Sequence, residues 1–423
     1  MTTVYEIDPL VENAVFARDE SARKRDKWEI HELASGQGIH PASIQGLYTA
    51  MGKGLVSGRT VPAINIRGIT YHVARAVFRA ALKHRVGAFI FEIARSEIAY
   101  TAQRTGEYAT CVLAAAVKEG FKGPVFLQGD HFQVSRKVYD SNPERELNAV
   151  KGLVREAIAD GFLNIDIDAS TLVDLEKQSL GGQQEKNCLV TADITDLIRN
   201  IEPRGITISI GGEIGEVGKK NSTVADLRAF MAGYLGRLDP SVKGISKISV
   251  QTGTTHGGVV LPDGSVASVK VDFKTLEEIS KVAREEYGLA GAVQHGASTL
   301  PDEAFDMFPK AGTAEVHLAT GFQNLIYDSP YFPKELLDKI YKHLLENYIS
   351  EKMPDDTEDQ FLYKTRKKAF GDFKRQMWNL PDENLREIRE MLEERFSLLF
   401  QKLNVADTVD LVNRFVVPPY LSK

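Results

Sequence analysis

The chain has 423 residues, of which 43% are hydrophobic and 26% charged, as is typical of a globular protein with a sizeable core. Its 52 Lys and Arg against 58 Asp and Glu give a net charge of -6, and the absence of a basic cluster argues against nucleic-acid binding. The two cysteines, Cys111 and Cys188, are far apart in the chain, which argues against a disulfide framework. No apolar run is long enough for a membrane span, and the N-terminus does not resemble a secretory signal, so we expect a cytoplasmic protein.

Residues 1–60 lie outside any regular pattern of strands, and we expect a helical N-terminal extension there. Eight short runs rich in Val, Ile and Phe follow, at 61–66, 88–93, 125–130, 163–168, 206–215, 245–253, 290–296 and 313–319. Segments with helical periodicity, such as 73–85 and 273–288, separate them. Continuous hydrophobicity is typical of parallel strands buried on both faces, so the α/β pattern predicts a (β/α)8 TIM barrel over 61–328.

An open, doubly wound sheet is the alternative fold. That fold normally carries a glycine-rich turn after its first strand, and this chain has a single glycine there. Residues 329–423 form a C-terminal helical extension in this interpretation. Within it, 380–405 has the spacing of an amphipathic helix that starts at Pro381 and Asp382. This helix packs on the barrel or on another subunit, or else it covers the site as a lid.

Polar side chains gather where the predicted strands end, which in a barrel is where the chemistry takes place. The candidates in chain order are Asp130, His131, Asp166, Asp168, Glu213, Glu216, His256, His295 and His317. Three of the imidazoles, at His131, His256 and His295, match the ligand type of a catalytic zinc site. We therefore predict a divalent metal, Zn²⁺ or another ion, at the mouth of the barrel.

Other polar residues in these strands have more than one interpretation. Asp166 and Asp168 point to the same face of one strand, so they need a cation or a lysine partner, or they form a salt bridge at the mouth. His317 is a fourth ligand, a substrate contact or a hydrogen-bonded core residue. Small residues follow His256 and His295, and their free backbone N–H groups predict a phosphate beside the metal.

The motifs Gly-Asp-His (129–131), Gly-Gly-Glu-Ile-Gly (211–215), Thr-His-Gly-Gly (255–258) and Gln-His-Gly-Ala-Ser (294–298) resemble those of class II, zinc-dependent ketose-bisphosphate aldolases. Fructose-1,6-bisphosphate aldolase is the commonest member of that family. The resemblance covers about 61–328 and implies reversible cleavage of a ketose bisphosphate to dihydroxyacetone phosphate and an aldehyde. It also implies that His131, His256 and His295 hold zinc, with Glu213 as an alternative ligand.

The same resemblance implies roles for further residues. Asp130 would move the proton of the hydroxyl at the breaking bond, and Glu216 would exchange the proton of the enediolate. Asp168 would lie near a bound monovalent cation. The expected contacts to phosphate and substrate come from Gly257, Gly258, Gly296, Ala297 and Ser298, with Asn65, Arg95, His317 and Thr320 as further candidates.

The chain also departs from the family. Where the family's eighth strand ends in Asn-x-Asp-Thr-Asp, this chain has His317-Leu318-Ala319-Thr320-Gly321. No loop for a second phosphate is evident, and Arg95 and Arg136 are the nearby basic candidates, so we expect broad tolerance for the aldehyde half.

Other functions stay open at this point. They are a metal-dependent ketose epimerase, an aldolase for another sugar such as a tagatose-type or sulfo-sugar phosphate, and a non-catalytic subunit of a tagatose-bisphosphate aldolase. We expect a homo-oligomer that acts on a small sugar phosphate.

Overall fold

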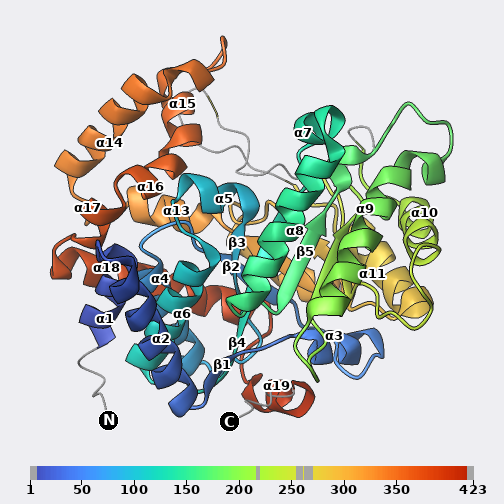
Figure 1. Ribbon diagram of the computed structural model, residues 1–423, viewed down its shortest axis with the longest axis horizontal. Helices are drawn as coiled ribbons and strands as arrows, with labels where there is room; N and C mark the ends of the chain where they lie inside the picture. The colour runs from blue at the N-terminus through green and yellow to red at the C-terminus, as the bar shows by residue number, and fades with distance from the viewer. Residues whose placement is uncertain (1–6, 216–219, 254–260, 262–269, 417–423) are drawn as a thin grey trace.

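The computed structural model describes residues 7–215, 220–253, 261 and 270–416. Eight parallel strands form a closed barrel, which confirms the predicted (β/α)8 fold (Figure 1). The strands are β2 (Val61–Asn65), β3 (Ile90–Ala94), β4 (Gly123–Gln133), β5 (Asn164–Asp168), β6 (Ser209–Glu213), β7 (Lys247–Ser249), β8 (Ala292–Gln294) and β9 (Glu315–Leu318). Their order is β4-β3-β2-β9-β8-β7-β6-β5, and pairing of β4 with β5 closes the barrel.

Each of the eight predicted runs overlaps one of these strands, although β3 ends one residue beyond its run and β4 extends beyond its run at both ends. Every residue of β2, β3, β5 and β6 is buried, as expected for parallel strands covered on both faces. The runs extend beyond several strands; the run 245–253, for example, contains only the three residues of β7.

Helices between the strands cover the outside of the barrel. They are α4 (Thr70–Lys83), α6 (Thr105–Glu119), α8 (Pro143–Ala159), α9 (Leu180–Ile201), α10 (Val224–Leu235) and α11 (Phe273–Tyr287), whereas the short helices α5 (Arg95–Tyr100) and α7 (Arg136–Ser141) lie at the mouth, just after β3 and β4. In α4, Val73, Val77 and Phe78 are buried and Lys83 at its end is exposed. This one-sided burial is what fixes an amphipathic helix against a sheet.

The N-terminal residues form α1 (Ile7–Phe16), α2 (Glu20–Gly36), β1 (Ile39–Pro41) and α3 (Gln45–Gly52). The short strand β1 was not predicted, and it pairs in parallel with the start of β4. The side chain of Tyr48 in α3 reaches the start of β9, where its hydroxyl donates to Glu315. Helix α3 therefore packs at the end of the barrel where the strands begin (Figure 1).

The C-terminal residues form α13 (Thr320–Tyr327), α14 (Lys334–Asn347), α15 (Glu358–Thr365), α16 (Ala369–Asp372), α17 (Lys374–Trp378), α18 (Asp382–Lys402) and α19 (Val409–Phe415). Helix α18 contacts α4 and α13, and its Phe396 ring lies 4.8 Å from that of Phe322. At its end, Leu403 accepts a hydrogen bond from the backbone of Thr60. Of the sequence-based alternatives for this helix, packing on the barrel wall is the one observed.

The helices α14 to α17 (334–378), here called the α14–α17 segment, lie between α13 and α18 in the chain. Helices α14 and α15 project at the upper left of Figure 1, and α7 also lies at the top of this view. None of the described helices is both long and apolar enough to cross a membrane.

Candidate active site

A cavity of about 500 Å³ opens at the carboxyl ends of the barrel strands. Residues at or just after the ends of β2, β3, β4, β8 and β9 line it, together with Lys367 from the α14–α17 segment. A second hollow of about 580 Å³ shares His131 with the cavity and extends toward Glu213. The volume of the cavity suits a small organic ligand, and its place at the strand ends is that of the active site in TIM-barrel enzymes.

The end of β4 has an irregular backbone that sets the direction of two side chains. The pairing of β4 with β5 shifts register between Gly129 and Phe132, and His131 has a left-handed φ of 38°. A Cβ atom at position 129 would lie 2.4 Å from the ring of Phe132, so this position requires glycine. The Gly-Asp-His motif is thus a bulged strand end that presents Asp130 and His131 to the cavity.

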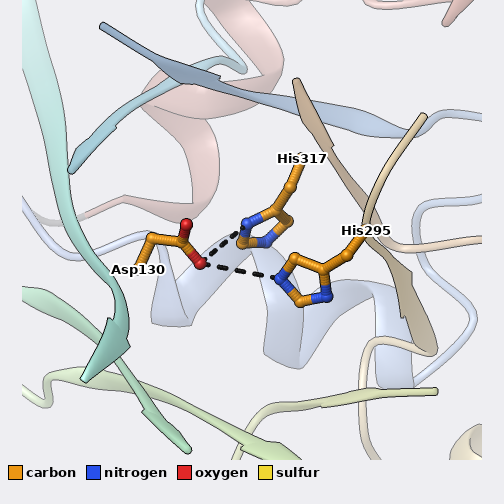
Figure 2. A group of neighbouring side chains, drawn as sticks. All are labelled: Asp130, His295 and His317. Atoms are coloured by element: carbon orange, nitrogen blue, oxygen red, sulfur yellow. Dashed lines mark ion pairs between the residues drawn. The ribbon is translucent and has the colours of Figure 1, made fainter. Parts of the chain in front are cut away.

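Asp130 lies among three imidazole rings. Its Oδ1 is 2.6 Å from Nδ1 of His131, 3.2 Å from Nδ1 of His317 and 3.6 Å from Nε2 of His295. Figure 2 shows its carboxylate directed at the last two rings, whose centroids are 4.1 Å apart. Burial would raise the pKa of Asp130, but the neighbouring His131 holds it well below its usual range. Asp130 is therefore an anion that can accept a proton.

Three of the predicted metal ligands come together beside Asp130. His131, Glu213 and His295 each offer one ligand atom, and these atoms lie within 4.8 Å of one another. His131 Nε2 is 3.5 Å from Glu213 Oε2. Burial raises the pKa of Glu213 to about 8, and the negative charge of Asp168 adds to this effect. Two imidazoles and a buried carboxylate fit a divalent transition metal, which would offset the cost of burying the acid.

The remaining predicted residues divide into three groups. Asn65, Arg95, Gly296, Ser298, His317 and Thr320 line the cavity. Ala297 and Asp168 are buried and are not among its lining residues; Asp168 accepts hydrogen bonds from Gln133 (2.5 Å) and Ser170 (2.6 Å). Glu216, His256, Gly257 and Gly258 lie outside the described residues.

A buried polar network fills the barrel beneath Asp130. Lys247 on β7 donates from Nζ to Gln128 (2.7 Å), Asp166 (3.0 Å) and Glu315. Gln128 in turn donates to Glu92 (3.0 Å) and to Glu315 (2.8 Å). The partner of Asp166 is thus a lysine, one of the alternatives that the sequence left open, whereas Asp168 has its own donors.

His317 joins this network to Asp130. Its Nε2 is 2.6 Å from Glu315 and its Nδ1 is 3.0 Å from Glu92. Burial would lower the pKa of His317, but Glu92 and the other surrounding acids raise it well above its usual value. The ring is therefore cationic, and it holds carboxylates in place on both of its nitrogens.

An ion pair between a partly buried arginine and a buried glutamate lies on the β2–β3 side of the cavity. Arg67 donates from Nε to Glu97 (2.8 Å) and from Nη1 to Thr320 (3.3 Å). The second oxygen of Glu97 accepts from the side chain of Asn65 (2.6 Å). Asn65, one of the predicted substrate contacts, is thereby fixed at the wall of the cavity.

The family model for class II fructose-bisphosphate aldolases matches residues 50–393. The chain belongs to the class II fructose-bisphosphate aldolase family. This family is metal-dependent, in agreement with the donor set of His131, Glu213 and His295.

Two solved aldolase structures share the fold. The YdjI aldolase from Escherichia coli K12 is 14% identical with a TM-score of 0.52, over 87% of this chain and 98% of its own. Fructose-bisphosphate aldolase from Campylobacter jejuni is 18% identical with a TM-score of 0.52, over 88% and 96%.

The barrel is also similar to one from outside the aldolases. The fructuronate-tagaturonate epimerase UxaE from Cohnella laeviribosi is 12% identical with a TM-score of 0.56, over 82% of each chain. At such identities these likenesses show the common fold alone. No curated protein matches this chain in sequence.

Sequence analysis did not identify several residues that form or support the site of this aldolase-family protein. They are Arg67, Glu92, Glu97, Gln128, Lys247, Glu315 and Lys367. For Glu92, Lys247 and Glu315 a signal was present, because each is a charged residue inside a run that otherwise reads as a buried strand. A charge buried in a strand core needs a partner, so such interruptions indicate an ionic network inside the barrel.

Proposed function

We propose that this protein is a metal-dependent aldolase that cleaves a ketose phosphate reversibly to dihydroxyacetone phosphate and an aldehyde. Fructose 1,6-bisphosphate is the first candidate substrate. The observation that carries the proposal is the position of the Asp130 carboxylate beside the His131, Glu213 and His295 donors at the mouth of the barrel. Family membership supports the same reaction class.

In this proposal His131, Glu213 and His295 hold the metal, with His256 as a further ligand predicted from the sequence. Zn²⁺ is our choice because imidazole-rich sites with an open position are typical of catalytic zinc. When bound, such an ion polarises the ketose carbonyl as a Lewis acid.

Asp130 is the general base for carbon–carbon bond cleavage in this proposal. It accepts the proton of the hydroxyl group on the carbon beyond the breaking bond, so that this carbon becomes the aldehyde. The electron pair of the broken carbon–carbon bond stays with the dihydroxyacetone half, which is then protonated at carbon. Glu216 is the sequence-based candidate for that second proton transfer.

The phosphate of the dihydroxyacetone half would bind where Gly296, Ser298 and Thr320 line the cavity. Backbone N–H groups and hydroxyls of small residues can approach an anion closely. His317 has a supporting role, because it holds Asp130 in place from below.

The test combines metal analysis of the purified protein with an assay of triose phosphate release. Fructose 1,6-bisphosphate, tagatose 1,6-bisphosphate and fructose 1-phosphate are compared, before and after removal of the metal by a chelator and its return. We expect release that disappears with the metal and reappears with Zn²⁺. Metal-replete protein that releases no triose phosphate from any of the three would refute the proposal.

A ketose epimerase is the second candidate. The observation in its favour is the eighth strand, where His317 and its neighbours replace the motif expected from the aldolase resemblance. Nuclear magnetic resonance of the same reaction mixtures separates the two functions, because an epimerase returns an intact six-carbon ketose whereas an aldolase returns two fragments.

A further inference from the structure

One carboxylate oxygen at the wall of the cavity has no hydrogen-bond donor. Glu92 on β3 lines the cavity and is fully buried, with an exposed fraction of 0%. Its Oε2 accepts from Gln128 (3.0 Å) and lies 3.0 Å from His317 Nδ1. No residue that the structure describes donates to its other oxygen, Oε1. A buried acceptor without a donor is costly, so Glu92 Oε1 needs a donor that the described residues do not supply.

Asn65 on β2 repeats this arrangement beside Glu92. The two residues are direct partners in the pairing of β2 with β3, so their side chains point to the same face of the sheet. Asn65 donates from Nδ2 to Glu97 (2.6 Å), which leaves Oδ1 as its acceptor. That atom, too, lacks a donor within the described part of the chain. The wall of the cavity at β2 and β3 therefore presents two acceptor oxygens from neighbouring strands.

The arginines of the cavity are bound to other acceptors. Arg67 forms an ion pair with Glu97 (2.8 Å), and Arg95 forms one with Glu146 (2.5 Å). A guanidinium that is already paired has fewer N–H groups left for another acceptor. A bound ligand is thus the natural source of the donor for Glu92 Oε1.

The chemistry of this wall favours a hydroxyl group of the ligand. A phosphate offers acceptor oxygens and negative charge, so it would be repelled by a carboxylate. A hydroxyl is a donor as well as an acceptor, and it can give its hydrogen to Glu92 Oε1. Burial raises the pKa of Glu92, although the neighbouring His317 opposes this effect. A donated hydrogen bond would stabilise the buried carboxylate.

Glu92 lies next to the proposed proton acceptor and away from the metal donors. His317 Nδ1 is 3.0 Å from Glu92 and 3.2 Å from Asp130, so one nitrogen contacts both carboxylates. Asp130 points toward the same ring in Figure 2. The ring of the metal donor His131 is 6.4 Å from that of His317. A ketose with its carbonyl at the metal and its reacting hydroxyl at Asp130 would extend its next carbon toward Glu92.

We propose that Glu92 binds the hydroxyl on the carbon next to the one that becomes the aldehyde, and that this contact selects aldehydes carrying that hydroxyl. The inference rests on the proposed aldolase function and deepens it, because it names the group by which the aldehyde half is recognised. It restricts the broad tolerance expected from the sequence to aldehydes with a hydroxyl at this position. Asn65 Oδ1 is a second acceptor at the same wall.

The test compares glycolaldehyde with acetaldehyde, which lacks only this hydroxyl, in condensation with dihydroxyacetone phosphate by the metal-replete full chain. The readout is the ratio of kcat/KM for glycolaldehyde to that for acetaldehyde, so a general loss of activity cancels. In Glu92→Leu we expect this ratio to fall about 10- to 100-fold below the wild-type ratio, the value of a hydrogen bond to a charged group. Glu92→Gln keeps the shape of the side chain, and its ratio should fall about 5-fold, because a hydrogen bond between neutral groups remains.

Glu315→Gln is the matched control. Glu315 is also fully buried, accepts from the same Gln128 (2.8 Å) and lies 2.6 Å from His317, but it is not among the residues that line the cavity. Its replacement can lower activity and should still leave the ratio at the wild-type value. An unchanged ratio in Glu92→Gln, or an equal fall in Glu315→Gln, would overturn the assignment, even where Glu92→Leu does not fold.

Binding separates this inference from the proposed function. The release of triose phosphate decides the aldolase proposal on its own. Where neither aldehyde reacts, calorimetric titration of fructose 1-phosphate and 5-deoxyfructose 1-phosphate decides the role of Glu92, because these ligands differ in the same hydroxyl. Fructose 1-phosphate should bind the wild type about 10-fold more tightly, and Glu92→Gln should reduce this advantage. Equal binding of the two ligands to the wild type, or binding of neither, would refute the hydroxyl site.

Discussion

Replacing Lys247 with methionine tests whether the ionic network holds the barrel together. The lysine side chain is 1% exposed, and its charge is shared between Asp166 and Glu315, which are 9% and 0% exposed. Removing one partner of a buried ion pair costs about 3–5 kcal/mol, because the remaining charge stays buried. His317 still faces Glu315 at 2.6 Å, so we expect the lower end of this range, about 3 kcal/mol.

The assay is equilibrium unfolding in urea at pH 7.5, followed by circular dichroism. Lys151→Met is the control, since Lys151 pairs with Asp193 at 2.6 Å with both side chains partly exposed, and such pairs contribute about 0–1 kcal/mol. Adding Glu315→Gln to Lys247→Met should recover part of the loss, because it removes one of the unpaired charges. A Lys247→Met protein as stable as the control would refute this account of the network.

Three further predictions concern the site and a buried histidine. Asp130→Ala should keep its metal and lose ketose cleavage by about 10²–10⁴-fold, measured on one preparation; loss of the metal would make Asp130 a ligand instead. His295→Ala should fall below one metal per chain by elemental analysis, and full metal content would remove His295 from the site. Burial lowers the pKa of His72 to about 3 from 6.5, so unfolding takes up a proton between these values and stability should be full above pH 6.5 and fall as pH falls toward 3. When the pH is lowered from 7.5 to 5, the free energy of unfolding measured in urea should therefore fall by about 2 kcal/mol less in His72→Leu than in the wild type. Equal falls in the two proteins would show that His72 is not the group responsible.

The barrel could be predicted because buried parallel strands produce a clear hydrophobic pattern in a sequence. Strands buried on both faces read as unbroken apolar runs, and the helices between them have a different period. The limits of the runs were less accurate, since apolar residues continue into the loops around β7. Strand β1 has only three residues, too few to show a period of two, and it pairs only with the beginning of β4.

The convergence of Asp130, His131, Glu213 and His295 could also be predicted, because the topology brings the carboxyl ends of all the strands to one mouth. Lys367 could not. It comes from a segment between α13 and α18 that has no counterpart in the strand–helix pattern, and nothing in its sequence places it over the cavity. Only the packing of Arg366 and Phe370 on the barrel puts it there.

The buried ionic network explains why a histidine suits the eighth strand, where the family motif has an asparagine. His317 contacts Asp130 above it and Glu315 below it, and Glu315 continues to Lys247 and to Tyr48 at the other end of the barrel. An asparagine at this position is neutral and could not offset both carboxylates as a cationic imidazole does. The chain therefore departs from the motif of the resembling family beneath Asp130, the proposed proton acceptor, whereas the proposed metal ligands His131, Glu213 and His295 match that family's motifs. A change of this kind alters how the proposed proton acceptor is held and leaves the proposed metal ligands in place.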